Sequence, residues 1–282
     1  MKKKGIQEFK KENHAVVGVV VAILLVGLFL AIMLVVQTVY IPNIMEQREA
    51  EHMDNIAYQF SLLKYAIDIQ SVAGKNTPIS TSMILGSREL PFLSSDRSFG
   101  YLDVSSDTCN ITISNGTAFE YSCGRIKYSS LNSYYINQEY VYETGAVISN
   151  QTQGNAMMIK PPFTATMVAN LNITWDLINI IGVGGKTTVS GYGTYPVQTQ
   201  FYRSNYTLIN NVNSIVIRTY YHTAWINFLN STMSQANLIE GADFTLAQGA
   251  GQVTLTFLPG LNVDIYVNDV TIRSQIAPGW VE

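Results

Sequence analysis

The pattern of hydrophobic positions is most uniform near the start of the chain. From Ala15 to Val36, a run of 22 residues, every position is apolar or glycine, and the run ends at Gln37 and Thr38. As a helix rising about 1.5 Å per residue, this run is about 33 Å long, enough to cross the hydrocarbon core of a bilayer. A secretory signal peptide has a shorter apolar run with a small-residue cleavage site after it, and none follows here. The pattern predicts a transmembrane helix over residues 15–41.

A second helix with a different pattern follows Pro42. Its apolar residues recur at steps of three and four, and they are Met53, Ile56, Phe60, Leu63 and Ile67. Charged residues such as Glu49 and Lys64 occupy other positions, which predicts a wet side. Pro42 either bends the rod or begins its second segment, and Gly74 and Pro78 end it. We expect an amphipathic stalk helix over 42–73, with its stripe docked on the following domain or on a neighbouring subunit.

From Ile79 onward the chain consists of short runs of β-branched and aromatic residues punctuated by Gly, Asn, Ser and Thr. Strands are expected over residues 109–114, 118–126, 140–148, 187–201, 214–221, 253–258 and 262–272. Thr223 is expected to cap one short helix, with a buried face made by Trp225, Phe228, Leu229 and Met233. The expected fold class is α+β: a long N-terminal transmembrane and stalk helix, then a mainly antiparallel, β-sandwich-like extracytoplasmic domain over 74–282.

Charge then orients the chain. Five lysines against two glutamates precede the apolar run, whereas acidic residues dominate directly after it. Lysine is retained on the cytoplasmic side, so residues 1–14 are predicted to be a basic cytoplasmic segment and the C-terminal domain to be extracellular. The lipid bilayer is therefore an expected partner. The whole chain carries a formal charge of −3, which gives no support for nucleic acid as a partner.

Two further features fit an extracellular domain. Six N-x-S/T acceptors lie after the apolar run and none before it, namely Asn110, Asn115, Asn150, Asn172, Asn205 and Asn230. The two cysteines, Cys109 and Cys123, flank the turn signal Asn115-Gly116 and are expected to face each other across a hairpin. We expect them to form a disulfide, with a pair of buried free thiols as the alternative.

Local signatures of catalysis or metal binding are weak. The segment from Gly182 to Thr187 resembles a phosphate loop, but the position that needs its first glycine is Ile180, so a hairpin turn is expected. The histidines His14, His52 and His222 have no ligand spacing. Asp103 and Asp107 are expected to be loop carboxylates. The sequence thus predicts no cofactor, no metal and no enzymatic activity, although a carboxylate pair formed only in space is left open.

The N-terminal sequence Lys10-Lys11-Glu12-Asn13-His14-Ala15-Val16-Val17-Gly18, followed by the apolar run, resembles the class III signal and helix of archaeal type IV pilin-like proteins. Later motifs resemble those of an uncharacterised archaeal family of pilin-like surface proteins, and they are Tyr134-Tyr135, Tyr142-Glu143-Thr144-Gly145, Val189-Ser190-Gly191-Tyr192-Gly193-Thr194, the helix with Trp225, and the segment from Val253 to Gly260. The resemblance implies a surface protein whose helix packs with like or related pilin-type subunits.

Three function classes follow from these observations. The first is a membrane-anchored, pilin-like structural protein of the cell surface, as a minor filament or adhesion subunit or as an anchored head of the same design. The second is an anchored ligand-binding or sensory ectodomain, which would act through a partner because only about 14 residues lie inside the cell. The third is an anchored ectoenzyme, which would need a deep pocket with converging carboxylates.

Overall fold

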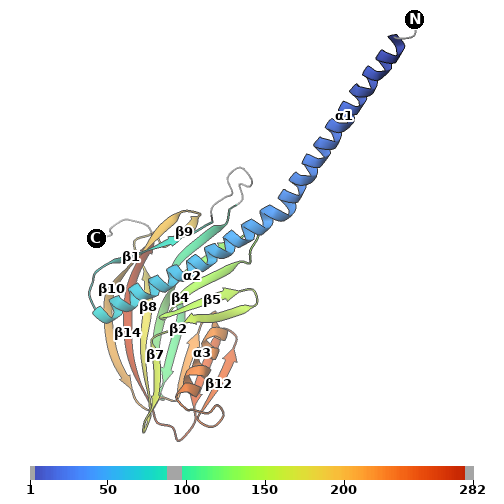
Figure 1. Ribbon diagram of the computed structural model, residues 1–282. Coiled ribbons are helices and arrows are strands. Elements are labelled where there is room, and N and C mark those ends of the chain that lie inside the picture. The colour runs from blue at the N-terminus through green and yellow to red at the C-terminus, as the bar shows by residue number, and fades with distance from the viewer. Residues whose placement is uncertain (1–3, 88–96, 277–282) are drawn as a thin grey trace.

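The computed structural model describes residues 4–87 and 97–276, with side chains from Val17 onward, so Lys2 and Lys3 of the basic segment lie outside the described residues. The described chain begins with one long rod made of α1 (Lys4–Val35), the π-helical η1 (Val36–Tyr40) and α2 (Ile41–Ala73). In Figure 1, α1 projects away from the rest of the molecule while α2 lies along the β domain. The expected long N-terminal helix is confirmed, and it starts eleven positions before Ala15, at Lys4.

From Val17 to Val35 the projecting part of the rod is apolar on all sides. Its large side chains from Val17 to Tyr40 are mostly half or more exposed, and the most apolar 18-residue window, with a mean hydropathy of 3.4, has no buried residue. Among the described residues, this rod is the one helix that is both long enough and apolar enough to cross a membrane. A soluble protein buries such a surface, so the isolated chain leaves α1 without its natural surroundings.

The rod bends where α1 meets α2 (Figure 1). A π-helical turn occupies Val36–Tyr40, and Pro42 stands in the first turn of α2, where its missing N–H costs least. Pro42 therefore begins the second segment, beside a π-turn of the kind that commonly bends helices. At the other end Gly74 adopts a left-handed conformation with φ 58°, and its N–H donates to the Gln70 carbonyl, which ends the helix as predicted.

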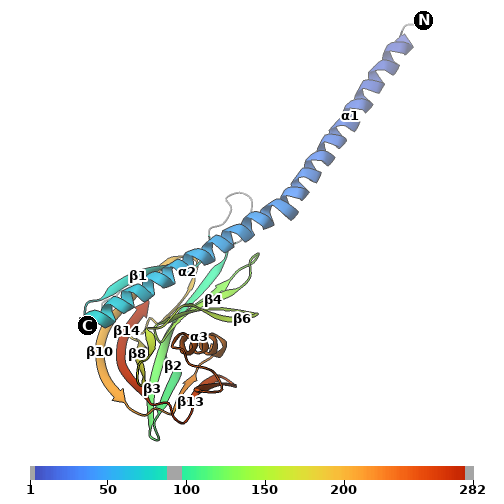
Figure 2. The ribbon, with the colours of Figure 1, turned by 60° about the horizontal axis from the view of Figure 1, so that its bottom comes forward.

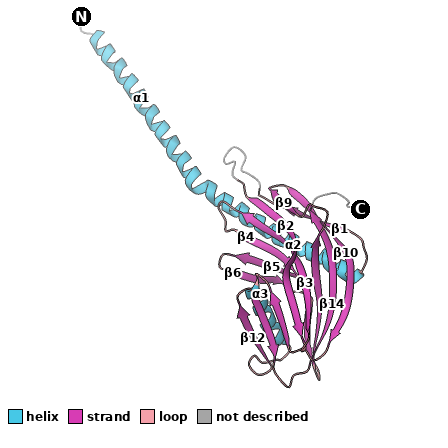
Figure 3. Cartoon of the chain, turned by 180° about the vertical axis from the view of Figure 1, so that it is seen from behind, coloured by secondary structure: helices cyan, strands magenta, loops and turns pink. Residues whose placement is uncertain are grey.

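The β domain contains two sheets in the described part of the chain, and Figure 3 shows them from behind. The first has five strands in the order β1 (Ile79–Ile84), β10 (Thr194–Ile209), β14 (Val263–Ile276), β8 (Leu171–Gly182) and β7 (Phe163–Met167). The second has nine: β12 (Phe244–Gly249), β13 (Gln252–Phe257), β11 (Ser214–Arg218), β2 (Phe99–Ser114), β3 (Ala118–Leu131), β4 (Gln138–Glu143), β5 (Ala146–Gln151) and β6 (Gly154–Ile159), with β9 (Thr188–Gly191) also paired to β2. All pairs are antiparallel except β8 with β14, so the mainly antiparallel β-rich fold is confirmed.

Helix α2 is part of the core of this domain. It contacts β1, β10 and β14 of the first sheet and β4 and β5 of the second. All five residues of the predicted stripe are at most 1% exposed and pack in one cluster with side chains of both sheets, such as Leu102 and Tyr128. Burial of each such side chain stabilises the fold by about 1.5–3 kcal/mol. The predicted docking of the stripe on the chain's own β domain is confirmed.

The side of α2 that was predicted to face solvent is only partly exposed and only partly polar. Glu49 is fully buried and Lys64 nearly so, because Glu49 is hydrogen-bonded inside the fold and Lys64 pairs with Asp68 at 2.7 Å. Directly opposite the docked stripe lies a second apolar series, spaced alternately by four and three residues and exposed to solvent, made of Tyr58, Leu62, Tyr65, Ile69 and Val72. We call this series the outer stripe.

Several local predictions need correction. Residues 140–148 form two strands, because Thr144 and Gly145, both with positive φ, make a tight turn between β4 and β5. Residues 187–201 are likewise divided between β9 and β10. The turn after Gly182 is present, but it is no hairpin, since β8 and β9 belong to different sheets.

The short helix α3 (His222–Gln235) buries Trp225, Phe228, Leu229 and Met233 as predicted. Thr223 does not cap it. Tyr221 stands at the cap position without a side-chain hydrogen bond, and the side chain of Asn155, from β6, accepts a hydrogen bond from the Ala224 N–H at 2.7 Å. A cap supplied by a distant strand leaves no local sequence signal. Figure 2 shows α3 apart from α2, with the strands of the second sheet near both.

Candidate functional site

Strand β4 explains why one face of the second sheet carries a groove. Successive side chains of a strand point to opposite faces. Tyr140 and Tyr142 pack in the cluster of α2, whereas Val141 and Glu143 lie on the other face, which α3 covers. Glu139 shares the face of Val141 and Glu143 but stands beyond the end of α3. The uncovered part of that face is the floor of a groove of about 690 Å³.

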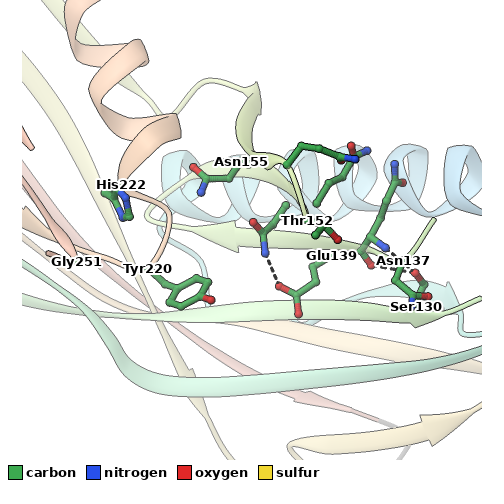
Figure 4. Close-up of a pocket in the computed structure, with 13 residues that line it drawn as sticks. Ser130, Asn137, Glu139, Thr152, Asn155, Tyr220, His222 and Gly251 are labelled. Atoms are coloured by element: carbon green, nitrogen blue, oxygen red, sulfur yellow. Dashed lines mark hydrogen bonds between the residues drawn. The ribbon is translucent and has the colours of Figure 1, made fainter.

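The lining of this groove comes from four separate parts of the chain (Figure 4). Six of the thirteen lining residues carry side-chain amides, and these are Asn137, Gln138, Asn150, Gln151, Gln153 and Asn155. Hydroxyl, aromatic, acidic and imidazole groups and two glycines complete the wall, from Ser130, Glu139, Thr152, Gly154, Tyr220, His222 and Gly251. We call this site the amide groove.

Register holds the floor of the amide groove together. Ser129, Glu139 and Asn150 are direct partners across β3, β4 and β5. The Glu139 carboxylate accepts hydrogen bonds from the Ser129 hydroxyl and the Asn150 amide, each at 2.9 Å, and pairs with Lys127 at 3.4 Å. Burial alone would raise the pKa of Glu139, but these donors outweigh it and lower the pKa, so the carboxylate stays ionised.

Glu139 is the one acidic residue among the lining residues. Two-carboxylate glycoside hydrolysis needs a second carboxyl group on the other side of the scissile bond. The lining residues of the amide groove therefore offer no such pair.

A second polar cluster lies under α3, out of contact with water. Glu143 is fully buried, and its carboxylate accepts hydrogen bonds from the Thr219 hydroxyl at 2.7 Å and from the Trp225 indole at 3.1 Å. Burial raises the pKa of Glu143, although these donors and Arg125 oppose the shift. The cluster joins β4, the segment directly after β11 and α3, and it brings together the Glu143 and Trp225 motifs noted in the sequence. Its burial assigns it to structure.

The cysteines lie where the sequence places them, but the disulfide is absent. Cys109 and Cys123 are direct partners in the hairpin of β2 and β3, which turns at Asn115-Gly116. Both are free thiols, at most 3% exposed. Burial, followed by the charge of Glu143, raises the pKa of both thiols, which disfavours the thiolate that disulfide chemistry needs. The predicted bond is corrected to the alternative, a pair of buried thiols.

The six glycosylation acceptors differ in accessibility. Asn205 on β10 and Asn230 on α3 are exposed. The other four are half-buried and have side-chain hydrogen bonds within the fold, and these are Asn110, Asn115, Asn150 and Asn172. Asn150 is a special case, because its amide nitrogen, the atom that a glycan would modify, donates to Glu139 inside the amide groove.

The remaining residues weighed in the sequence do not converge on a site. Asp103 and Asp107 each accept a hydrogen bond from a serine hydroxyl, of Ser105 and Ser122 respectively. His52, on α2, is buried against the β domain, and its Nε2 lies 3.1 Å from the Tyr128 hydroxyl. It is far along the chain from His222. Among the described residues no group of three or more His, Cys, Asp or Glu side chains is placed to hold a metal.

Comparison of the chain with models of protein families, with curated proteins and with solved structures gave no match.

Proposed function

We propose that the protein is a single-pass surface protein of pilin-like design, in which α1 lies in the bilayer or between neighbouring helices and the β domain is the extracellular head. The observation that carries this proposal is the division of one continuous rod. From Val17 to Val35 its first half is apolar and exposed on all sides, while its second half is built into the core of the head. Because the rod is continuous, the position of α1 determines the position of the head directly.

The outer stripe supports packing with like subunits. Its five residues follow the alternate spacing of four and three that places side chains along one seam between packed helices. Tyr65 and Val72 are 66% and 86% exposed, so the isolated chain leaves this seam open to water. On the same rod, the exposed polar residues Gln47, Glu51 and Asp54 separate this seam from the apolar surface of α1. A neighbouring rod laid against the seam would remove its apolar side chains from water.

The test compares assembly with stability. The double variant Leu62→Ser/Tyr65→Ser should leave the melting temperature of the head nearly unchanged and reduce recovery of the protein in sheared surface filaments at least tenfold. Tyr206→Ser, which removes an equally exposed tyrosine on β10, is the matched control and should assemble normally. A protein found only in the membrane fraction, with all three forms behaving alike, would contradict assembly and leave an anchored monomer.

The amide groove favours a second candidate function, an anchored ligand-binding ectodomain. A surface groove of about 690 Å³ falls within the range of small-molecule sites in proteins. The two functions are compatible, since the groove is formed by the face of the second sheet turned away from α2. In this second case the head would bind its ligand whether or not the rods assemble.

A further inference from the structure

The amide groove has a composition that selects against most ligand classes. No lysine or arginine stands among its lining residues, so an anionic ligand such as a phosphate or sulfate would find no counter-charge. No aliphatic side chain lines it either, so a lipid or an apolar peptide would gain little by entering. Its one charge, on Glu139, is already satisfied by Lys127, Ser129 and Asn150. The suitable ligand is neutral and polar.

Hydrogen bonds within the fold fix what the amides present. The side-chain oxygen of Asn137 accepts from the Asn132 N–H at 2.7 Å, and that of Asn155 accepts from the Ala224 N–H at the same distance. Their NH₂ groups therefore remain as donors in fixed orientations. In the described part of the chain, the side chains of Gln151 and Gln153 take part in no hydrogen bond, so each keeps a donor and an acceptor. The wall thus offers both donors and acceptors, which sugar hydroxyls can pair with.

One aromatic ring completes the wall. Tyr220 is 72% exposed and meets Tyr221 edge-on, with ring centroids 5.6 Å apart. Because Tyr221 is buried, this contact holds Tyr220 in place while leaving its ring available to a ligand. The C–H-bearing face of a pyranose is the apolar part of a sugar, and it packs well on such a ring. Figure 4 shows the Tyr220 ring between His222 and the polar side chains of Glu139 and Asn137.

From these contacts we propose that the amide groove binds a neutral oligosaccharide, with Tyr220 as the stacking residue and the amides of Asn137, Gln153 and Asn155 as hydroxyl ligands. The oligosaccharide is either free, on another surface, or the protein's own glycan at Asn150. The proposal rests on the groove alone and does not need the rods to assemble.

The test uses the full chain, produced without glycosylation and held in lipid nanodiscs, because maltoside detergents carry a competing sugar. Maltohexaose, mannohexaose and chitohexaose are the probes, and sialyllactose and a heparin hexasaccharide are the anionic comparators. At least one neutral hexasaccharide should bind, and Tyr220→Ala and Gln153→Ala should each weaken that binding at least tenfold. Tyr206→Ala, the matched exposed tyrosine outside the groove, should change it less than twofold.

Each contrary result would overturn the proposal: no neutral probe binds, the anionic probes bind more tightly, or the groove variants bind as the unchanged chain does. The source of the sugar is decided in a second arm. Protein glycosylated at Asn150, verified by intact mass, should fail to bind added hexasaccharide if its own glycan fills the groove. It should still bind added hexasaccharide if the ligand is free or belongs to another surface.

Discussion

At the scale of single residues, Glu49 shows how a charge can be buried to advantage. Its carboxylate accepts hydrogen bonds from three successive backbone N–H groups, of Ser133, Tyr134 and Tyr135, at 3.0, 2.8 and 2.7 Å. Three such hydrogen bonds replace most of the stabilisation that the carboxylate loses on leaving water. Glu49 therefore fastens the loop between β3 and β4, and with it one end of the amide groove, to helix α2.

Glu49→Gln should lower the free energy of unfolding by about 1.5–3 kcal/mol, because an amide offers one acceptor in place of two and turns an NH₂ group toward backbone donors. Denaturant unfolding of the full chain measures the change. Glu46→Gln, at an exposed position of the same helix, is the control and should stay within about 0.5 kcal/mol of the unchanged protein. Equal effects of the two substitutions would show that the clamp contributes nothing.

Glu143 should make stability depend on pH in the opposite sense to most carboxylates. Its pKa is raised in the folded state by burial, so the folded protein holds this proton more tightly than the unfolded chain does. The stabilisation is complete below the unfolded pKa of about 4.3 and is lost as the pH rises through the folded pKa. Glu143→Gln, which cannot ionise, should gain stability relative to the unchanged protein as the pH rises over this range.

The measurement is the difference in unfolding free energy between the two proteins at several pH values from 4 to 8. A difference that does not vary with pH would mean that Glu143 titrates alike in both states. Thr219→Val separates the hydrogen bond from the charge, because it removes one donor to the carboxylate and should raise the folded pKa further.

At the scale of elements, the docking of α2 is the contact most open to test. Phe60 is fully buried among side chains of both sheets and lies 6.0 Å, centroid to centroid, from Tyr140. Phe60→Ala should cost about 3–5 kcal/mol of stability, since it removes a large buried side chain and leaves a cavity. Tyr65→Ala, on the opposite face of the helix and about one turn further along, should cost little. Thermal unfolding of both variants decides, and similar losses would contradict the docked arrangement.

The elements also show what the sequence could predict. The apolar run, the docked stripe and the buried face of α3 were predictable, because helical periodicity is local and burial follows it. The outer stripe was not predicted, because the charged residues around it favoured a polar, solvent-facing side of the helix. The tight turn at Thr144-Gly145 was missed although Gly145 is a turn signal, because the apolar residues on either side of it resemble one long strand.

The candidate site was beyond sequence reasoning for a different reason. The residues of the amide groove come from four parts of the chain: the β3–β4 hairpin, the β5–β6 hairpin, the start of α3 with the segment before it, and the turn at Gly251. They meet only through the order and register of the strands in the second sheet. An Asn- and Gln-rich stretch such as Asn150 to Asn155 reads as a loop until Glu139 and Tyr220 are placed beside it.

At the scale of the whole molecule, orientation in the membrane remains a prediction and can be tested with the protein's own thiols. Cys109 and Cys123 are buried, so the unchanged protein should not react with a membrane-impermeant maleimide. Thr245→Cys, at an exposed position of β12, should be labelled on intact cells, and Lys4→Cys only after the cells are made permeable. The reverse pattern would place the β domain in the cytoplasm and refute the topology predicted from the lysines.

The immediate docking of α2 has a consequence for reach. Ile41 and Met45 are already packed against the head, beside Tyr134, directly after the π-turn. No free length of chain separates α1 from the head, so the expected stalk is in fact a structural member of the domain. If α1 stays in the bilayer, the head can contact only what comes within about its own diameter of the lipid surface. Access to more distant surfaces would require α1 to leave the bilayer and stack with others, so that extension away from the cell is gained by adding copies.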